Sequence, residues 1–243
     1  MGDFFDFKLI PYYHVGMTCY FDAHCHIQNI ATAECLATGD APVYAINNAA
    51  QISDWGMVIQ IANNCPNVFG AIGIHPWYVS DLPVDWDAQL HNALVANPKL
   101  MIGEIGLDKL RGNIALQLPV FTRQLDLAYE LSRGVHIHCV DAFDTLLPIL
   151  CARGEKLPPF ILFHRYGGNP MNIERLAREY NAYFSYRAGD SVRRILATPS
   201  DRILTETDGD NPTKVVETSK QIAAIRNDTS LNFYNNTMKM LGL

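Results

Sequence analysis

The chain has 243 residues, of which 49% are hydrophobic and 18% are charged. This composition excludes extensive disorder, and the length suits either one closed α/β barrel of about 250 residues or two small domains. The formal net charge of −6 is opposite to the basic balance of most proteins that bind nucleic acid through broad phosphate contact, although a local basic rim around a cleft is compatible with it.

The N-terminal segment has acidic residues among its aromatic ones and no apolar core, so it is unlike a signal peptide. No run approaches the roughly 18 apolar residues of a membrane span. The six cysteines are scattered and form no Cys-x-x-Cys pair. These features predict a cytoplasmic protein with reduced thiols and no membrane contact, present as a monomer or a weak homo-oligomer.

Short β-branched and aromatic runs recur along the chain and predict eight strands. They are Cys19–His24, Pro42–Ile46, Val68–Ile74, Leu100–Glu104, Val135–His138, Phe160–His164, Ala182–Tyr186 and Arg202–Glu206. The segments between them predict helices at Asp54–Asn63, Asp87–Ala96, Asn113–Ser132, Asp141–Cys151, Met171–Tyr180, Ser191–Ala197 and Pro212–Arg226. Asp87, Asp141 and Ser191 stand where helix N-caps belong. The connection Ile27–Ala41 is short and gives the weakest indication of a helix.

Strands that alternate with helices predict a parallel sheet, and eight is the number that closes a (β/α)₈ TIM barrel. No linker-like change of composition divides the chain, so we expect a single barrel domain over residues 17–243. Residues 1–16 precede the first strand. They are either an N-terminal arm packed on the barrel floor or a leader in front of a true start at Met17.

Six of the predicted strands run through apolar residues and then stop on a histidine or an acid. The carboxyl ends of barrel strands meet at one mouth, where the active sites of TIM barrels lie. One such residue would be an ordinary structural side chain, but six in the same relative position point to a shared site.

His24 and His26 are two residues apart, which places both imidazoles on one face of a strand. The other candidate ligands are Glu104, His138, His164 and Asp208. Four imidazoles and two carboxylates exceed the needs of one tetrahedral zinc with an open position, but they suffice for two divalent ions that share a bridging carboxylate. Such mixed ligands suit Zn, Mn or Fe, and they tolerate Mg if water completes its shell.

From Cys19 to its end, the chain resembles the TatD-type metal-dependent deoxyribonucleases of the amidohydrolase superfamily. The last residues, FYNNTMKMLGL, are similar to the closing helix of that family. The matching motifs are D-x-H-x-H at Asp22–His26, G-I-H-P at Gly73–Pro76, G-E-I-G-L-D at Gly103–Asp108, E-T-D at Glu206–Asp208, His138 before Asp141-Ala142, and His164-x-Tyr166-x-Gly168. The family's fold is a (β/α)₈ barrel, in agreement with the strand count.

The resemblance implies that His24, His26 and Asp208 bind one metal. Glu104 would bridge to a second metal held by His138 and His164. A divalent pair of Zn, Mg or Mn would then lower the pKa of a water, and Asp208 and Glu104 are the catalytic residues. The implied reaction is hydrolysis of DNA or of another phosphodiester.

His75 has no place among these ligands. It is expected either to contact the substrate phosphate or to fix the turn at Pro76. Trp77, which follows Pro76, would either stack on a base or pack on the rim.

The sequence departs from the family pattern where the strand that carries His138 ends, because Val140 occupies a position that is usually Arg. Val cannot hold a phosphate through bidentate hydrogen bonds. Arg165 or Arg187 could supply that cation, or both could be solvated loop residues, and we take Arg165 as the candidate substrate-binding residue. The Asp of Gly209-Asp210 adds a negative charge near the mouth.

Two alternative functions therefore stay open. One is a metal hydrolase of the same superfamily that acts on a small-molecule ester, lactone or amide bond. The other is a non-catalytic metal-binding barrel, against which the presence of all six ligand positions argues.

Overall fold

The computed structural model describes residues 18–36 and 42–243. The prediction for residues 1–16 and part of that for the first connection lie outside the described residues. Within the described part of the chain, no helix combines the length and the apolar character that crossing a membrane would require.

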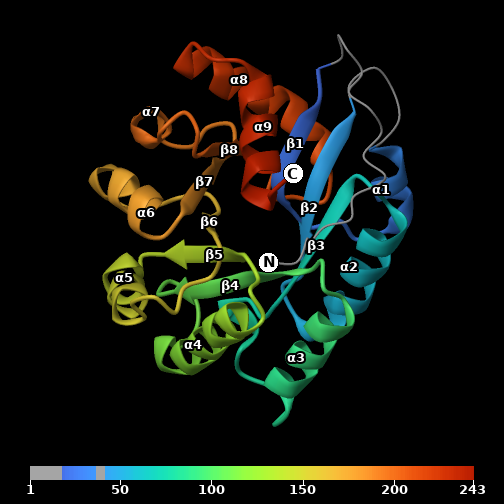
Figure 1. The fold of residues 1–243 in the computed structure, drawn as a ribbon, viewed down its shortest axis with the longest axis vertical. Helices are drawn as coiled ribbons and strands as arrows, with labels where there is room; N and C mark the ends of the chain where they lie inside the picture. Colours follow the sequence, from blue (N-terminus) through green and yellow to red (C-terminus); the bar gives the residue numbers. More distant parts are fainter. Residues whose placement is uncertain (1–17, 37–41) are drawn as a thin grey trace.

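The strands form one parallel sheet in which each pairs with the next along the chain, from β1 to β8 (Figure 1). Their bounds are β1 Tyr20–Cys25, β2 Val43–Asn48, β3 Val68–Ile72, β4 Met101–Asp108, β5 Val135–Val140, β6 Ile161–Phe163, β7 Ala182–Tyr186 and β8 Ile203–Thr205. The edges meet where the Asp208 amide donates to the His24 carbonyl at 3.0 Å and the His26 amide donates to the Gly209 carbonyl at 2.8 Å. The predicted (β/α)₈ barrel is confirmed.

In the described part of the chain, helices surround the sheet, one after each strand, and a further helix, α9, comes last (Figure 1). Their bounds are α1 Ile30–Cys35, α2 Ile52–Asn64, α3 Trp86–Ala96, α4 Ile114–Glu130, α5 Phe143–Ala152, α6 Ile173–Glu179, α7 Val192–Ala197, α8 Val215–Arg226 and α9 Ser230–Leu241. Short 3₁₀ turns at η1 Pro76–Tyr78, η2 Pro170–Asn172 and η3 Pro212–Lys214 precede α3, α6 and α8. The helices α6 and α8 therefore begin at Ile173 and Val215, later than the predicted starts at Met171 and Pro212.

The predicted N-caps are right at one helix and wrong at two. Ser191 is the N-cap of α7. Asp141 instead adopts a left-handed φ of 49°, and the N-cap of α5 is Ala142. Asp87 lies inside the first turn of α3, where a carboxylate still faces the positive end of the helix dipole, and the N-cap is Asp85.

The apolar core has an inner and an outer part. Outside the sheet, strand side chains pack against the helices that surround it, from α1 to α8. Inside the barrel, residues such as Phe21 of β1, Leu162 of β6 and Leu204 of β8 pack with Tyr234 and Met240 of α9. Because Phe21 and Met101 of this inner cluster come early in β1 and β4, α9 closes the amino end of the barrel. The carboxyl end, which we call the mouth, stays available for polar side chains.

A bulge in β1 sets which side chains reach the mouth. Asp22 pairs with Ala45 but Cys25 pairs with Asn47, so one extra residue lies in β1. Phe21 and Ala23 belong to the inner core. Because of the bulge, the next residue, His24, faces inward too, on the same side as His26. Strict alternation would have pointed His24 outward.

A second bulge has the same effect in β4. Ile102 pairs with Val135 and Ile105 with Ile137, so three residues of β4 oppose two of β5. Met101 faces the inner core, and after the bulge Glu104 faces the mouth. The structure also corrects the predicted end of this strand: β4 continues to Asp108, so that Glu104 lies within the strand rather than at its end.

Candidate metal centre

The carboxylate of Glu104 lies at the centre of the mouth with imidazoles on both of its oxygens. Its Oε2 is 3.3 Å from Nε2 of His24 and 3.3 Å from Nε2 of His26. Its Oε1 is 2.9 Å from Nδ1 of His138 and 2.8 Å from Nε2 of His164. One carboxylate thus faces two pairs of nitrogen ligands, the arrangement that a bridging ligand between two ions needs.

Asp208 completes the set from the loop after β8. Its Oδ1 is 3.7 Å from Nε2 of His26. Ligand atoms of Asp208, His24 and His164 also lie within 4.8 Å of one another, as do those of His24, His26 and Glu104. The fold therefore brings together all six residues that the sequence singled out as metal ligands.

The outer nitrogens of two ligating histidines are held by neighbouring acceptors. Nδ1 of His26 lies 2.9 Å from the Asn48 carbonyl, which accepts its proton and leaves Nε2 free toward Glu104. Nε2 of His138 lies 3.2 Å from Oδ2 of Asp108, which leaves Nδ1 free. Such outer partners fix the tautomer and orientation of a metal-binding histidine.

His164 has a comparable outer partner in Glu206, whose Oε1 is 3.4 Å from its Nδ1. Glu206 is completely buried and also accepts a short hydrogen bond from the Ser185 hydroxyl. His164 therefore also presents Nε2 to the centre.

The residues fit a metal centre by a further criterion. Nε2 of His24 is buried and, although Oε2 of Glu104 lies 3.3 Å away, makes no hydrogen bond within the described part of the chain. A buried polar atom without a partner is costly, and a metal ion would supply the missing contact. With imidazole nitrogens and carboxylate oxygens as donors, the set would suit divalent ions.

His75 faces the same carboxylate but is arranged as a donor. Its Nδ1 accepts the backbone N–H of Trp77 at 3.1 Å, so the neutral ring carries its proton on Nε2. That Nε2 lies 3.4 Å from Oε1 of Glu104. A protonated ring nitrogen cannot ligate a metal, but it can donate to an oxygen of a substrate.

The charges of the cluster stabilise one another. Burial alone would raise the pKa of Glu104, but its electrostatic interactions with His164, His75 and His24 hold this pKa well below the usual value. Burial alone would lower the pKa of His26, but contacts with Asp208 and Glu104 raise it to about 10.

The pKa of His164 shows the same balance as that of His26. Burial opposes its charged form, but Glu104 and Glu206 raise the pKa well above the usual value. Burial alone would raise the pKa of Asp208, but the hydrogen bond with His26 and the charge of His164 lower it. Without metal, the centre therefore holds protons between its carboxylates.

These residues open into a cavity of about 770 Å³. Arg165 lines it, and its guanidinium lies 3.3 Å from Oδ2 of Asp208 and 3.6 Å from Oδ1 of Asp190. Arg187, the other candidate cation, is not among the lining residues. Val140 does line the cavity, so an apolar side chain stands where an arginine is usual in the family.

Two contributors to the site were not identified from the sequence, although both lie in the quoted motifs. Asp108 touches His138 and Glu206 touches His164. Asp108 follows Glu104 by four residues, an even spacing that puts both on one face of a strand. That signal would have found it if the strand had been extended beyond Glu104.

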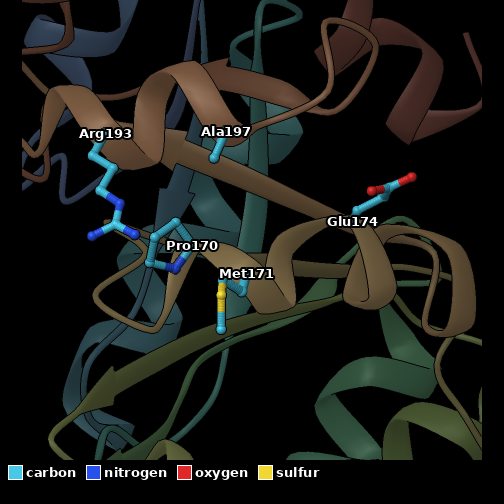
Figure 2. Close-up of a pocket in the computed structure, with 5 residues that line it drawn as sticks. All are labelled: Pro170, Met171, Glu174, Arg193 and Ala197. Atoms are coloured by element: carbon cyan, nitrogen blue, oxygen red, sulfur yellow. The ribbon is translucent and has the colours of Figure 1, made fainter.

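A second hollow lies between the loop of η2, helix α6 and helix α7 (Figure 2). It contains one carboxylate, that of Glu174, and no histidine. Figure 2 shows Glu174 and the guanidinium of Arg193 on opposite sides of it. This hollow lacks the ligands for a metal centre.

Comparison with known proteins identifies relatives of this arrangement. Residues 21–240 match the family model described as TatD related DNase. The chain is 37% identical over 150 residues to the 3'-5' ssDNA/RNA exonuclease TatD of Cronobacter turicensis, a match that covers 56% of this chain and 55% of the relative. It is 32% identical over 155 residues to the human 3'-5' RNA nuclease TATDN2, which covers 58% of this chain and 20% of the relative.

Among solved structures, the TatD homologue YjjV of Escherichia coli superimposes with a TM-score of 0.79 at 22% identity, covering 92% of this chain and 98% of the other. This likeness supports the barrel fold. The matched segments, in contrast, span about half the length of the bacterial relative and a fifth of the human one.

Proposed function

The chain belongs to the TatD related DNase family, and from this we propose that it is a divalent-metal-dependent nuclease that hydrolyses phosphodiester bonds at the Glu104 centre. The observation that carries the proposal is the position of Glu104, with His24 and His26 on one carboxylate oxygen and His138 and His164 on the other. This is a ligand set for two ions, and paired ions are a common device for phosphoryl chemistry.

When bound, the two ions supply Lewis-acid chemistry, which lowers the pKa of a water and offsets the charge that develops on the phosphate. The protein's own part is to hold the ligands and to move a proton. Asp208 is ionised because its pKa is lowered, and Arg165 holds its Oδ2 while Oδ1 faces His26. Asp208 therefore accepts the proton of the attacking water.

His75 acts on the substrate in this proposal. Its Nε2–H points into the cavity beside Glu104 and donates to a non-bridging phosphate oxygen. Arg165, on the rim, adds positive charge on the phosphate side of Asp208. The loss of His75 should slow cleavage less than the loss of Asp208 or Glu104, because His75 stabilises charge without holding the ligand set.

The substrate follows from the relatives, whose names describe nucleases of single-stranded DNA and RNA. We infer a nucleic-acid strand as the substrate of this chain. The test is cleavage of end-labelled single-stranded DNA, RNA and duplex DNA by the purified protein with Mg²⁺, Mn²⁺ or Zn²⁺. Cleavage that depends on an added metal and is lost in Asp208→Ala is expected, and failure to cut any phosphodiester with any of the ions would refute the proposal.

One observation favours a second candidate. The cavity lining contains five carboxylates but only two arginines, and Val140 lies among them, so few arginines are available to hold a phosphate. The second candidate is hydrolysis of an ester, lactone or amide bond in a small molecule. Turnover of lactone or amide substrates by a preparation that leaves every phosphodiester intact would establish it in place of the nuclease.

A further inference from the structure

An indole and a guanidinium stack on each other on the wall of the cavity that holds Glu104. The Cζ atom of Arg111 lies 4.2 Å from the ring centroid of Trp77. Both side chains line the cavity. Trp77 is 43% exposed, although tryptophan has the largest side chain. A large aromatic ring left this open beside a candidate catalytic centre calls for an explanation.

The indole is fixed in place by Asp108. Its Nε1–H donates to Oδ2 of this buried carboxylate at 2.7 Å. The same carboxylate holds the loop that carries Arg111, because Oδ1 accepts the backbone N–H of Leu110 at 2.8 Å and that of Arg111 at 3.0 Å. One side chain therefore positions both members of the stack.

Gln117 of α4 supports the loop from behind. This completely buried amide donates to the carbonyl of Asp108 at 3.0 Å and to that of Arg111 at 2.8 Å, and it accepts the Asp108 N–H at 2.8 Å. The loop is thus pinned at both ends. A platform fixed before a ligand arrives loses less entropy on binding than a mobile one.

The charge of Arg111 is available to a ligand. Of the two arginines in the cavity lining, Arg165 pairs with Asp208 and Asp190. Arg111 contacts no carboxylate within the described part of the chain, and its partner is the Trp77 ring. A partly exposed aromatic ring together with a cation that contacts no carboxylate matches a nucleotide, whose base stacks on aromatic rings and whose phosphate attracts arginine.

We propose that Trp77 and Arg111 form a stacking subsite for the base of the nucleotide next to the phosphate at the metal centre. The subsite adjoins the centre directly: the ring centroid of His75 is 4.7 Å from that of Trp77, and Asp108 also contacts His138. Stacking requires a base that is free of a duplex, so the subsite favours unpaired ends. This inference rests on the proposed nuclease function.

The test compares binding of two labelled oligonucleotides to the metal-loaded protein by fluorescence anisotropy. One is oligodeoxythymidylate and the other has abasic sites in place of every base, both with phosphorothioate linkages to slow cleavage. Their backbone charge is equal, so the ratio of their dissociation constants reports base contacts alone. We expect the wild type to prefer the base-bearing strand by about 5- to 100-fold.

Trp77→Ala should bind both strands alike, and Trp77→Phe, which keeps a ring but loses the bond to Asp108, should keep part of the preference. Arg111→Gln should weaken both strands and make binding less dependent on salt. Tyr129→Ala and Arg178→Gln are matched controls, because these exposed residues lie at the far ends of α4 and α6. Neither control should change the ratio.

The proposal is overturned if the wild type binds neither strand or both equally, or if Trp77→Ala keeps the full preference while it folds and binds metal like the wild type. In these cases the stack only stabilises the rim. Cleavage assays separate this result from the parent proposal. A base preference that disappears in Trp77→Ala without any phosphodiester cleavage would keep the subsite and reject the nuclease, and cleavage with an unchanged preference would do the reverse.

Discussion

At the scale of single residues, the mouth is organised around one carboxylate. Glu104 neutralises several imidazoles at once, and they in turn lower its pKa. The same contacts raise the pKa values of His26 and His164, so these rings bind protons tightly when no metal is present. Protons and metal ions therefore compete for the same nitrogen atoms.

This competition predicts a pH dependence of metal affinity. At neutral pH, metal must displace the protons of His26, with a pKa of about 10, and of His164. Affinity should rise with pH by about tenfold per unit for each proton displaced, and level off as the pH passes the pKa of His26. Calorimetric titration with Mn²⁺ in two buffers of different ionisation enthalpy measures the protons released. An affinity independent of pH, without proton release, would contradict the charge balance described above.

Asp108 gives a second prediction at this scale. Asp108→Asn leaves a single acceptor oxygen for the N–H groups of Trp77, His138, Leu110 and Arg111, so His138 loses its fixed orientation. Metal affinity should fall by about 10- to 100-fold. Asp144→Asn is the control, since this exposed carboxylate pairs with Lys109 away from the centre. Equal affinities in the two variants would show that Asp108 does not position His138.

The sequence was informative about the ligands and less so about their supports. His24, His26, His138 and His164 could be found because each follows an apolar run at a strand end. Asp108 could not be placed, because an apolar run broken by Gly103 and Glu104 indicates that a strand stops there. The contacts between distant strands that make β4 longer are not encoded in its local pattern.

At the scale of elements, two bulges change the facing of β1 and β4 just before their ligands. The strand pairing is irregular at those points. As a result, apolar side chains fill the amino end of the barrel and the candidate ligands face the mouth. Gly106 lies just after the bulge in β4. It has φ of +150°, and a Cβ there would lie 1.8 Å from the carbonyl oxygen of His138.

Gly106→Ala should therefore separate β4 from β5. We expect a loss of stability of more than about 3 kcal/mol, or failure to fold, because the added carbon meets backbone that cannot move aside. Gly189→Ala is the control: its φ is also positive, at +87°, but a Cβ would meet nothing within 4 Å. It should cost only about 1 kcal/mol. Thermal or urea unfolding measures both, and equal losses would mean that backbone strain rather than contact with His138 dominates.

The existence and order of the elements were predictable, whereas the bulges were not. Apolar runs such as Ile161–Phe163 and Ala182–Tyr186 are short, contain β-branched or aromatic residues, and are each followed by a polar residue, which indicates buried strands. A bulge depends on the register between two strands. Neither FDAHCHI nor MIGEIGLD alone records which residue of the neighbouring strand it faces.

At the scale of the whole molecule, stability and chemistry occupy opposite ends of the barrel. The amino end is closed by α9 and packed with apolar side chains, and the mouth gathers charged and polar ones. The division is typical of TIM barrels. In the proposed nuclease, divalent ions at the mouth would offset carboxylates such as Glu104 and Asp208, so an acidic chain is compatible with a phosphate substrate.

Met240 of α9 tests this separation. The side chain is 6% exposed within the inner core. Met240→Ala should destabilise the protein by about 2–5 kcal/mol through the cavity it leaves. The melting temperature should fall by roughly 5–20 °C. Metal affinity measured well below that temperature should match the wild type. A large loss of affinity would show that the two ends are coupled.

We propose above that Glu104 bridges two divalent ions that are needed to cleave nucleic acid. The most direct measurement is elemental analysis of the dialysed, metal-loaded protein, with cleavage of single-stranded DNA followed on the same samples, for wild type and Glu104→Ala. We predict about two ions per chain and metal-dependent cleavage for the wild type, and loss of bound metal with a fall in rate of at least about a hundredfold for the variant. A Glu104→Ala protein that keeps both its metal and its activity would contradict this role of Glu104.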